Sequence, residues 1–495
     1  MTVPADAYSS RRAFLRTLAA GAGGIVVAPD LLRAMHSGRW DSASHISFAD
    51  EGWDHVPEIL KRIVAPTFPA HDFVITSYGA RGDGPTDCTS AFRSAIGACH
   101  AAGGGRVVVP AGRFLTGAIH LRSNVNLHVQ GGATILFNRD PGAYLPAVDT
   151  RWEGMEMMGY SPFIYAFAQE NIAVTGAGTL DGNADDGHWW PWNGNPRHGW
   201  KTGEPKQQPA RDRLMQMVED GTPVAIRAFA DASYLRPQFV QPYRCRNVLI
   251  EDVRIVNSPM WEIHPVLCTN VTVRRVKISS HGPNNDGCDP ESCRDVLIEE
   301  CEFDTGDDCI AIKSGRNGDG RRLRSPTENV VIRNCVMKDG HGGVTIGSEI
   351  SGDVRWVFAE RCTMDSPQLD RALRLKTNAM RGGTLEHIFM RDVTIGEVAD
   401  AVVQIDFNYE EGAKGAFMPV VRDINVERVS CRNSRYALNL RGFPDAPIVD
   451  VRLTDYRFHD VAKGSVVENV RRLQLDRVSV NGKPVDAHTV MKVGS

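Results

Sequence analysis

A short pattern recurs along most of the chain, in which an Asn or Asp residue is followed by alternating apolar and polar residues. The clearest copies begin at Asn247, Asn270, Asp295 and Asn329. Looser copies begin at Trp356, His387, Asp423, Asp450 and Arg472, and successive starts are 22 to 36 residues apart. Alternation with period 2 is typical of β-strands, and short strands at such spacing without helical segments between them are typical of stacked coils. The pattern predicts an all-β fold built as a single β solenoid.

The register of this repeat can be checked at the sixth residue after each start. That position is apolar in every copy: Val253, Val276, Cys301, Cys335, Cys362, Val393, Val429, Tyr456 and Val478. Stacked coils bury equivalent positions on one another, so an unbroken apolar column is expected to face the core. We therefore interpret the three cysteines of the column as small core residues. A disulfide between Cys288 and Cys293 stays open.

Two segments depart from the repeat. Before it, apolar residues at helical spacing predict a helix from about Thr86 to Ala101, which would cap the N-terminal end of the solenoid. Within it, residues from about 181 to 241 form an insertion with a predicted helix at about 209–219. The insertion holds four tryptophans, Trp189, Trp190, Trp192 and Trp200. Insertions in solenoids often form a binding wall, so these rings could stack on sugars or could merely pack the insertion.

The N-terminal segment contains Arg11-Arg12 before Phe14-Leu15 and a Gly/Ala-rich apolar run. This arrangement resembles a twin-arginine export signal, although an amphipathic helix is the alternative. We predict a signal at 1–28, a linker or N-terminal extension at 29–70 and the solenoid domain at 71–495. The apolar run is too short for a permanent membrane anchor, so we expect a soluble protein that is periplasmic or secreted.

Charge is nearly balanced, with 56 Lys and Arg against 60 Asp and Glu. A balanced chain has no strong overall field that would recruit nucleic acid or an anionic membrane. We expect neither as a partner, and we expect a monomer.

Several polar residues fall into columns when they are placed on the repeat. Asp307 lies 12 residues beyond Asp295, and His341 lies 12 beyond Asn329. Equal offsets on consecutive coils make the two residues neighbours about 4.8 Å apart along the stack. Asp286 precedes Asp307 by 21 residues, which places it on the adjacent coil.

Two cations complete the predicted site. Arg374 and Lys376 lie roughly one coil beyond His341, and period 2 sends both to the same face with Leu375 opposite. The predicted patch on one side of the solenoid therefore holds three carboxylates, an imidazole and two cations: Asp286, Asp307, Asp308, His341, Arg374 and Lys376. Clustered carboxylates suit Ca²⁺, but the adjacent cations would compete with a metal ion and no loop has convincing ligand spacing, so we predict no metal and no cofactor. Glycoside hydrolysis fits better, because it needs one carboxylic acid to protonate the leaving oxygen and one carboxylate to activate water.

Four motifs occur in a specific order from residue 284 to residue 376: Asn-Asn-Asp-Gly-Cys-Asp, Gly-Asp-Asp, Gly-His-Gly and Arg-Leu-Lys. In this order they resemble the polygalacturonases, glycoside hydrolase family 28, and the resemblance extends from about Phe73 onward. It implies a right-handed parallel β-helix and an inverting hydrolase that cleaves the α-1,4-galacturonosyl bonds of pectin. The partner would be an acidic plant polysaccharide such as polygalacturonate, whose carboxylates suit the cation pair.

The resemblance also implies individual roles. Asp307 would be the general acid, Asp286 and Asp308 would activate water, and His341 would support the acid. The substrate-binding residues would be Asn284, Arg374, Lys376 and Tyr409, and Tyr409 could instead be structural. The usual Thr of the first motif is Asn285 here and the usual Ile of the last is Leu375, and neither change removes a catalytic group.

Several alternatives stay open at this point. Exo action is the weaker preference, because the insertion could close one end of the cleft, and an endo-polygalacturonase or a rhamnogalacturonan hydrolase is the nearest alternative. A β-helix pectate lyase and a non-catalytic polysaccharide-binding solenoid are further hypotheses. Inversion predicts that the carboxyl group of Asp286 or Asp308 lies about 6.5–9.5 Å from that of Asp307.

Overall fold

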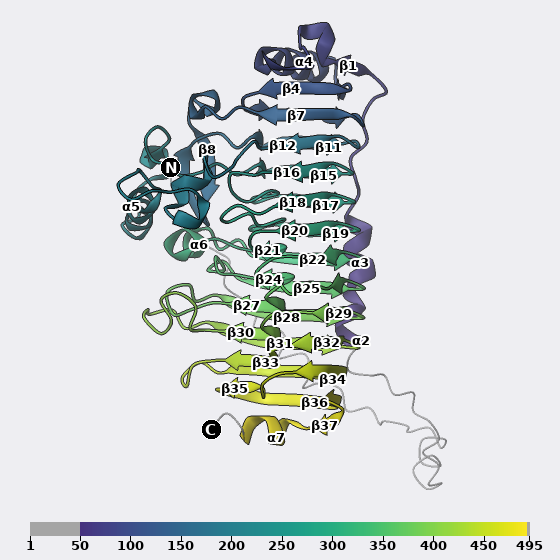
Figure 1. Cartoon of the computed structure of the whole chain (residues 1–495), viewed down its shortest axis with the longest axis vertical. Helices are drawn as coiled ribbons and strands as arrows, with labels where there is room; N and C mark the ends of the chain where they lie inside the picture. Colours follow the sequence, from purple (N-terminus) through teal and green to yellow (C-terminus); the bar gives the residue numbers. More distant parts are fainter. Residues whose placement is uncertain (1–49, 493–495) are drawn as a thin grey trace, which may run out of the picture. The chain divides into compact units, whose positions relative to one another are not determined.

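Parallel strands stack one above another in the computed structural model, which describes residues 50–492 (Figure 1). The predicted signal segment at 1–28 lies outside the described residues. The described residues belong to one compact unit, and the strands of successive coils pair in parallel. The fold is a right-handed parallel β-helix, as predicted.

The strands form two long sheets and two small ones. The 25-stranded sheet contains β1 (Asp72–Val74), β2 (Asp83–Asp87), β3 (Gly105–Val109), β4 (Gly112–Thr116), β6 (Val125–Val129), β7 (Ala133–Phe137), β11 (Glu170–Thr175), β12 (Thr179–Asp181), β15 (Arg246–Glu251), β16 (Arg254–Val256), β17 (Thr269–Arg274), β18 (Lys277–Ser280), β19 (Arg294–Glu299), β20 (Glu302–Thr305), β22 (Thr327–Arg333), β23 (Val336–Met337), β25 (Val354–Glu360), β26 (Thr363–Met364), β28 (Thr384–Arg391), β29 (Thr394–Glu397), β31 (Val420–Glu427), β32 (Ser430–Ser434), β34 (Ile448–Val461), β36 (Val470–Val480) and β37 (Lys483–Val485). The six-stranded sheet contains β21 (Ile310–Ile312), β24 (Val344–Ile346), β27 (Arg371–Lys376), β30 (Ala401–Asp406), β33 (Tyr436–Arg441) and β35 (Val466–Glu468). The small sheets are β5 (Ile119–His120), β10 (Ile164–Phe167) and β14 (Val240–Tyr243), and β8 (Val148–Trp152), β9 (Met155–Gly159) and β13 (Ala228–Phe229).

The repeat predicted from the sequence is the register of the stack. Val248, Val271, Val296, Val330 and Val357 pair in turn across five consecutive strands. The nine residues of the predicted apolar column are all buried. Their burial confirms the inward-facing ladder.

The residue that begins each copy of the repeat marks a bend in the backbone. All nine have φ between 55° and 60°, a left-handed conformation that Asn and Asp adopt more readily than other non-glycine residues. Some of their side chains also form a ladder, in which Asn270 Nδ2 donates to Asn247 Oδ1 at 2.8 Å and Asn329 Nδ2 to Asp295 Oδ1 at 2.9 Å. The preference for Asn and Asp thus follows from the corner that every coil must turn.

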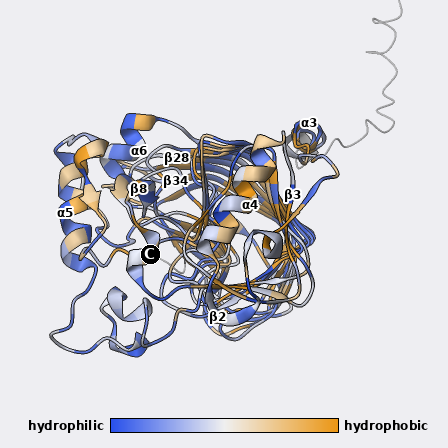
Figure 2. Cartoon of the chain, turned by 90° about the horizontal axis from the view of Figure 1, so that it is seen from above, coloured by the Kyte–Doolittle hydropathy of each residue, from blue (hydrophilic) through white to orange (hydrophobic). Residues whose placement is uncertain are grey.

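The helices lie at the ends and sides of the stack. They are α2 (Asp50–Trp53), α3 (His55–Arg62), α4 (Thr89–Ala101), α5 (Gln208–Glu219), α6 (Asn317–Leu323) and α7 (Ala487–Lys492), with 3₁₀ turns η1 (Ile75–Tyr78), η2 (Pro141–Tyr144), η3 (Trp190–Asn193), η4 (Pro196–His198) and η5 (Val224–Ile226). Figure 2 looks down the stack and shows α4 lying across its end. Phe92, Ile96 and Cys99 of α4 are buried against the first coils, which caps the open end of the core.

The segment predicted as a linker or N-terminal extension at 29–70 contains two helices in the part that the structure describes. Helices α2 and α3 pack against the long sheet, where the Trp53 ring lies 5.3 Å from that of Phe358 and Arg62 Nη2 lies 2.7 Å from Asp295 Oδ1. Figure 1 shows α3 alongside several successive coils. This segment is a strap, and apolar burial holds it in place.

The insertion begins after β12 and ends at β14, and it contains α5 close to its predicted place. It packs on the antiparallel hairpin of β8 and β9, which the sequence did not predict. Leu214 and Val218 of α5 are buried against Trp152 of this hairpin and Trp261 of the stack. The insertion therefore stands beside the coils on one face (Figure 1).

All eleven cysteines lie within the described residues, and each is buried with a free thiol. The disulfide left open between Cys288 and Cys293 is not formed. Among the described helices, none combines the length and the apolar character that crossing a membrane requires.

Candidate active site

Three aspartates meet where two consecutive coils leave the long sheet. Asp307 and Asp308 lie between β20 and β21, and Asp286 lies on the preceding coil. The two coils are joined there by backbone hydrogen bonds from Gly287 N to Asp308 O at 3.0 Å and from Asp307 N to Asn285 O at 3.2 Å. One carboxylate oxygen of each aspartate lies within 4.8 Å of the other two. The structure therefore brings the three predicted carboxylates together.

Inversion predicts about 6.5–9.5 Å between whole carboxyl groups, and here one oxygen atom of each carboxylate lies within 4.8 Å of the others. The stacking brings these atoms together. Asp286 and Asp308 are held on coils joined directly by hydrogen bonds, and Asp307 is the chain neighbour of Asp308.

Asp308 is fixed by partners on the next two coils of the six-stranded sheet. Its Oδ1 accepts hydrogen bonds from Thr345 Oγ1 at 2.9 Å and Arg374 Nη1 at 3.1 Å, and its Oδ2 accepts one from Lys376 Nζ at 2.7 Å. Burial raises the pKa of the Asp308 carboxyl, but Lys376 and Arg374 outweigh it and hold that pKa well below its usual value. Asp308 is therefore an ionised anchor, and both predicted substrate-binding cations are paired with it.

Asp307 is paired with His341, as the repeat predicts. The Nδ1 atom of His341 lies 3.0 Å from Asp307 Oδ1, and His341 N donates to Asp307 O at 3.0 Å. Burial raises the pKa of Asp307, but the hydrogen bond and charge of His341 outweigh it and lower that pKa. The same hydrogen bond raises the pKa of His341. At rest, the proton of this pair resides on the imidazole.

Asp286 has the opposite environment. It is buried, its Oδ1 has no hydrogen-bond partner, and its Oδ2 lies 3.6 Å from Lys313 Nζ. Burial and the negative charges of Asp289 and Asp307 raise the pKa of Asp286. An unpartnered buried acceptor is costly, so this oxygen is suited to hold a water molecule or a substrate group.

Two cavities meet at the aspartates. The outer cavity has a volume of about 630 Å³ and the inner one about 190 Å³. Asn284, Asp307 and His341 line both. A chain that ran from one cavity into the other would pass directly over Asp307.

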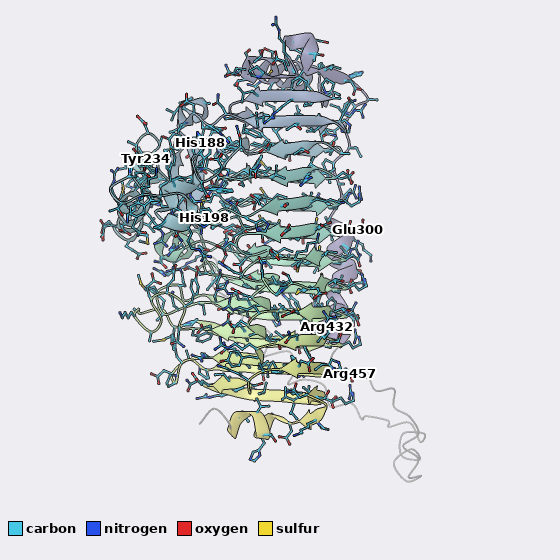
Figure 3. All side chains as sticks on the ribbon, in the orientation of Figure 1. His188, His198, Tyr234, Glu300, Arg432 and Arg457 are labelled. Carbon is cyan, nitrogen blue, oxygen red and sulfur yellow. The ribbon has the colours of Figure 1, made fainter. Side chains whose placement is uncertain are left out.

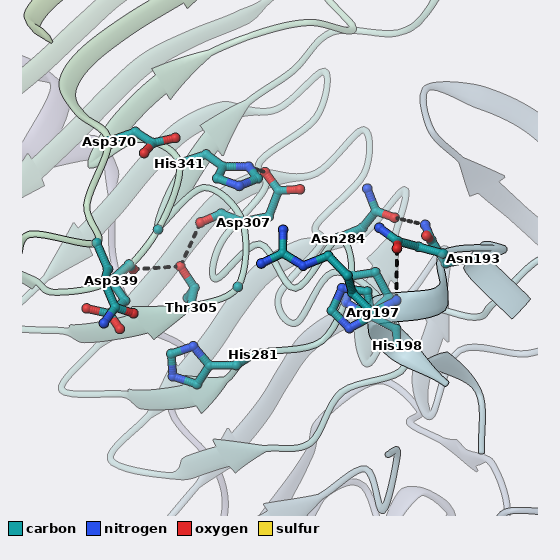
Figure 4. A pocket seen from close by; sticks show the side chains of 15 residues that line it. Asn193, Arg197, His198, His281, Asn284, Thr305, Asp307, Asp339, His341 and Asp370 are labelled. Atoms are coloured by element: carbon teal, nitrogen blue, oxygen red, sulfur yellow. Dashed lines mark hydrogen bonds and ion pairs between the residues drawn. The ribbon is translucent and has the colours of Figure 1, made fainter. Parts of the chain in front are cut away.

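The outer cavity lies between the insertion and the stack (Figure 4). Arg197 and His198 come from η4 of the insertion, and Asp339 and Asp370 form the opposite side. Figure 4 shows the Arg197 side chain extending across this cavity toward Asp307.

The inner cavity is also lined by charged residues from outside the repeat. Arg211 of α5 donates from Nε to Glu153 Oε2 at 2.7 Å, and Arg316 Nη1 lies 3.1 Å from the same oxygen. Glu153 lies at the turn between β8 and β9. The hairpin and the insertion thus supply one wall of this cavity.

Asn284 and Tyr409 also reach the site. Asn284 Oδ1 accepts hydrogen bonds from Arg236 Nη2 at 2.7 Å and Asn193 Nδ2 at 3.3 Å, so the insertion holds its amide. Tyr409 lines the inner cavity, with its ring centroid 5.3 Å from Lys376 Nζ. All eight predicted site residues are therefore gathered around the two cavities or directly beneath them.

Lys313 is a site residue that sequence reasoning missed. Its Nζ lies 3.6 Å from Asp286 Oδ2 and 3.3 Å from Glu349 Oε2, and it is buried. A signal was present, because Ile312 pairs through Ile346 with Leu375, which puts Lys313 in the column of Lys376. Arg211 and Glu153 gave no such signal, since neither belongs to the repeat.

The three aspartate oxygens are close enough together to bind a metal ion. The partners already present argue against such a site, because Thr345, Arg374 and Lys376 use both oxygens of Asp308. Lys313 places a further positive charge beside Asp286. Cations at this distance oppose a divalent ion electrostatically.

A parallel β-helix with carboxylates, an imidazole and cations in one cleft has the groups of a polysaccharide-cleaving glycoside hydrolase. Residues 230–473 match the family described as "Glycosyl hydrolases family 28". A crystal structure of a hyperthermoactive exopolygalacturonase from Thermotoga maritima is 47% identical, with a TM-score of 0.85, over 87% of this chain and 96% of that one. The chain belongs to glycoside hydrolase family 28 and is a glycoside hydrolase.

Two curated relatives are more distant. A probable polygalacturonase from Vitis vinifera is 28% identical over 80% of this chain and 76% of its own length. An exo-poly-alpha-D-galacturonosidase from Dickeya chrysanthemi is 29% identical over 68% of this chain and 57% of its own length.

Proposed function

We propose that the protein hydrolyses the α-1,4-galacturonosyl linkages of polygalacturonate and releases the terminal sugar. The observation that carries this proposal is the small inner cavity beside Asp307, which contains Arg374 and Lys376 and has Arg211 and Glu153 in one wall. Cations there suit the carboxylate of a uronic acid, and the wall suits a chain end. The relationship to the Thermotoga maritima exopolygalacturonase supports the same activity.

In the proposed reaction, Asp307 protonates the glycosidic oxygen as the bond from that oxygen to the anomeric carbon breaks. The proton comes from the hydrogen-bonded pair of Asp307 and His341, in which it rests on the imidazole and passes to Asp307 across 3.0 Å. Water attacks the anomeric carbon, and Asp286 accepts a proton from that water. Asp308 supports the reaction as the fixed negative charge that orients Arg374 and Lys376.

We propose inversion of the anomeric configuration. Retention needs a carboxylate that attacks the sugar, and two features oppose this. Asp308 is fully buried and both of its oxygens are already hydrogen-bonded. Asp286 is buried with a free acceptor, which suits a water molecule. Proton NMR of the first product during hydrolysis tests this, because a retained anomer would overturn the proposal.

Product analysis on polygalacturonate tests the activity and its mode. Galacturonate as the only early product supports exo action, whereas a ladder of oligomers supports the endo alternative. An unsaturated product that absorbs in the ultraviolet, and that no longer forms when a chelator is added, would indicate a lyase. Release of reducing ends from rhamnogalacturonan but not from polygalacturonate would favour a rhamnogalacturonan hydrolase. No release from either substrate would favour a non-catalytic polysaccharide-binding protein.

We also propose that the enzyme is exported and acts as a monomer on pectin. The motif around Arg11-Arg12 supports export. An acidic polysaccharide is too large to be taken up before it is degraded. Cell fractionation with and without Arg11→Lys and Arg12→Lys substitutions tests the first point, and light scattering tests the second.

A further inference from the structure

The four tryptophans of the insertion occupy four different environments. Trp189 is buried in the main core, and Trp190 donates from Nε1 to Ser258 O at 2.8 Å. Trp200 stacks under Lys206, whose Nζ lies 5.0 Å from its ring centroid. Trp192 packs on Trp189, with ring centroids 4.9 Å apart, and both line a cavity together with Tyr234. Trp192 is only partly buried against the main core, and its ring also contacts that of Tyr234 at the cavity.

This cavity has a volume of about 460 Å³, within the range of small-molecule binding sites. It lies in the insertion, where Figure 3 labels Tyr234 and His188. The Trp192 and Tyr234 rings are 5.1 Å apart at 87°. Neither the Trp192 indole nor the Tyr234 hydroxyl hydrogen-bonds to another described residue, so both polar groups are available to a ligand.

A third polar group of the cavity is both unpartnered and buried. The Nε1 atom of Trp189 is buried and has no hydrogen-bond partner, and Trp189 lines this cavity. A buried N–H without a partner is costly, and native proteins rarely leave one without an acceptor. Trp189 and Tyr234 also have φ of 69° and 58°, and such strain in bulky residues is concentrated at functional sites.

The cavity is next to the catalytic cleft. The turn η3 separates them, because its Pro191 and Trp192 line this cavity and its Asn193 lines the outer cavity. A polysaccharide that extends from Asp307 through the outer cavity therefore reaches this place after crossing a single short turn.

The charges of the cavity indicate what kind of recognition it offers. Arg139 and Lys201 are matched by Asp186 and Glu204. The balance means that stacking and hydrogen bonding, rather than net charge, would hold a ligand. Sugar rings suit this surface, because their C–H faces stack on aromatic rings and their hydroxyls accept and donate hydrogen bonds.

We propose that this cavity is a distal saccharide site, in which Trp192 and Tyr234 hold sugar units of the same polysaccharide whose end is cleaved at Asp307. The proposal rests on the proposed polygalacturonase activity and adds a second contact outside the catalytic cleft. Long chains would bind at both places, whereas short oligomers would fill the catalytic cleft alone.

The test compares the full-length wild-type enzyme with Trp192→Ala on polygalacturonate and on digalacturonate. We expect kcat/KM on polygalacturonate to fall roughly ten-fold through a higher KM, while kcat/KM on digalacturonate stays unchanged. Trp200→Ala is the matched control, since it removes a tryptophan of the same insertion that lines neither cavity, and both substrates should be unaffected. Trp192→Phe keeps a stacking ring and should restore most of the loss.

Equal losses on both substrates, or no loss on polygalacturonate, would overturn the proposal. Unchanged turnover of digalacturonate shows at the same time that Trp192→Ala is folded. Titration calorimetry in the Asp307→Asn background gives a second measurement, in which Trp192→Ala should weaken binding of polygalacturonate and leave digalacturonate binding unchanged. A wild-type enzyme that releases nothing from polygalacturonate would instead contradict the proposed function, so the two failures are distinguishable.

Discussion

The Nδ1 atom of His341 lies 3.0 Å from Oδ1 of Asp307, and this contact joins an exposed imidazole to the aspartate that lines both cavities. The His341 side chain is 52% exposed and that of Asp307 only 19%. The imidazole can therefore exchange its proton with solvent more readily than the carboxylate. We propose the pair, rather than Asp307 alone, as the source of the proton.

The pH dependence of kcat/KM should report on both the proton-donating pair of Asp307 and His341 and the proton acceptor Asp286. His341 has a raised pKa, so the pair keeps its proton below that pKa and loses it as the pH rises through it, which sets the alkaline limit. Asp286 also has a raised pKa, and it must be ionised to accept a proton from water, which sets the acid limit. We expect a bell-shaped profile whose alkaline limit lies above the value of about 6.5 for a free imidazole. A pH–rate measurement on polygalacturonate checks this.

His341→Gln should move the alkaline limit to lower pH, because the remaining acid is then a carboxyl group. The loss in kcat should be about 10²-fold, which is the lower range for general acid catalysis. His281→Gln is a matched control, since His281 lines the outer cavity and pairs with Asp304 at 3.1 Å. An unchanged alkaline limit in His341→Gln would contradict the assigned pair.

Asp307→Asn should lower kcat by about 10²–10⁴-fold and leave the melting temperature and substrate binding nearly unchanged. The amide can still occupy the same space but cannot deliver the proton. Asp304→Asn is the control, because Asp304 lies in β20 shortly before Asp307 and pairs with His281 instead of the catalytic residues. Activity in Asp307→Asn within a few-fold of the wild type would contradict its role as general acid.

The backbone of the site could be predicted from the sequence, and the side-chain pairing could not. Offsets on the repeat place Asp307 beside His341, because each coil turns its corner at an equivalent residue in left-handed conformation. The same reasoning extended to Ile312 would have found Lys313. The hydrogen-bond partners of a side chain do not follow the repeat. The pairing of Asp308 with Arg374 and Lys376 therefore appears only in the structure.

The wall of the inner cavity was likewise beyond prediction. Arg211 and Glu153 lie in segments that do not share the register of the stack, so no column relates them to Asp307. The strap formed by α2 and α3 also lies outside the repeat. Its short amphipathic pattern does not indicate which face of the coils it covers.

Trp53→Ala should destabilise the protein by about 3–5 kcal/mol, since a large buried ring would be lost. Trp53 is 5% exposed and packs on Phe358 and Phe389, and Arg391 lies over its ring at 3.8 Å. Urea unfolding followed by circular dichroism measures the change. Val64→Ala, at a residue that is 64% exposed just after α3, should stay within about 0.5 kcal/mol of the wild type. Equal stability of Trp53→Ala and the wild type would mean that the strap contributes nothing.

Lys313→Met should move the acid limit of kcat/KM to higher pH and lower kcat. The charged groups that face Asp286 are Asp289, Asp307, Asp308 and Lys313, with the buried Glu262 alongside. Without Lys313 the remaining neighbours are all acids, so the pKa of Asp286 rises further and the carboxylate ionises only at higher pH.

The measurement is a pH–rate profile of Lys313→Met beside Lys338→Met, a surface lysine paired with Glu302. A purely structural role for Lys313 would lower activity equally at every pH. That result would show that Lys313 does not tune Asp286.

Arg211→Ala should change the products on polygalacturonate. Arg211 forms one wall of the inner cavity through its contact with Glu153, and its removal opens a path through the wall between α5 and the β8–β9 turn. A chain could then extend beyond the terminal position, so we expect digalacturonate and longer oligomers to accompany the monomer, measured by anion-exchange chromatography of early products. Arg213→Ala is the matched control on the same helix, because Arg213 stacks on Phe229 outside this cavity. If Arg211→Ala still released only the monomer while remaining active, closure by the insertion would not be what limits the enzyme to chain ends.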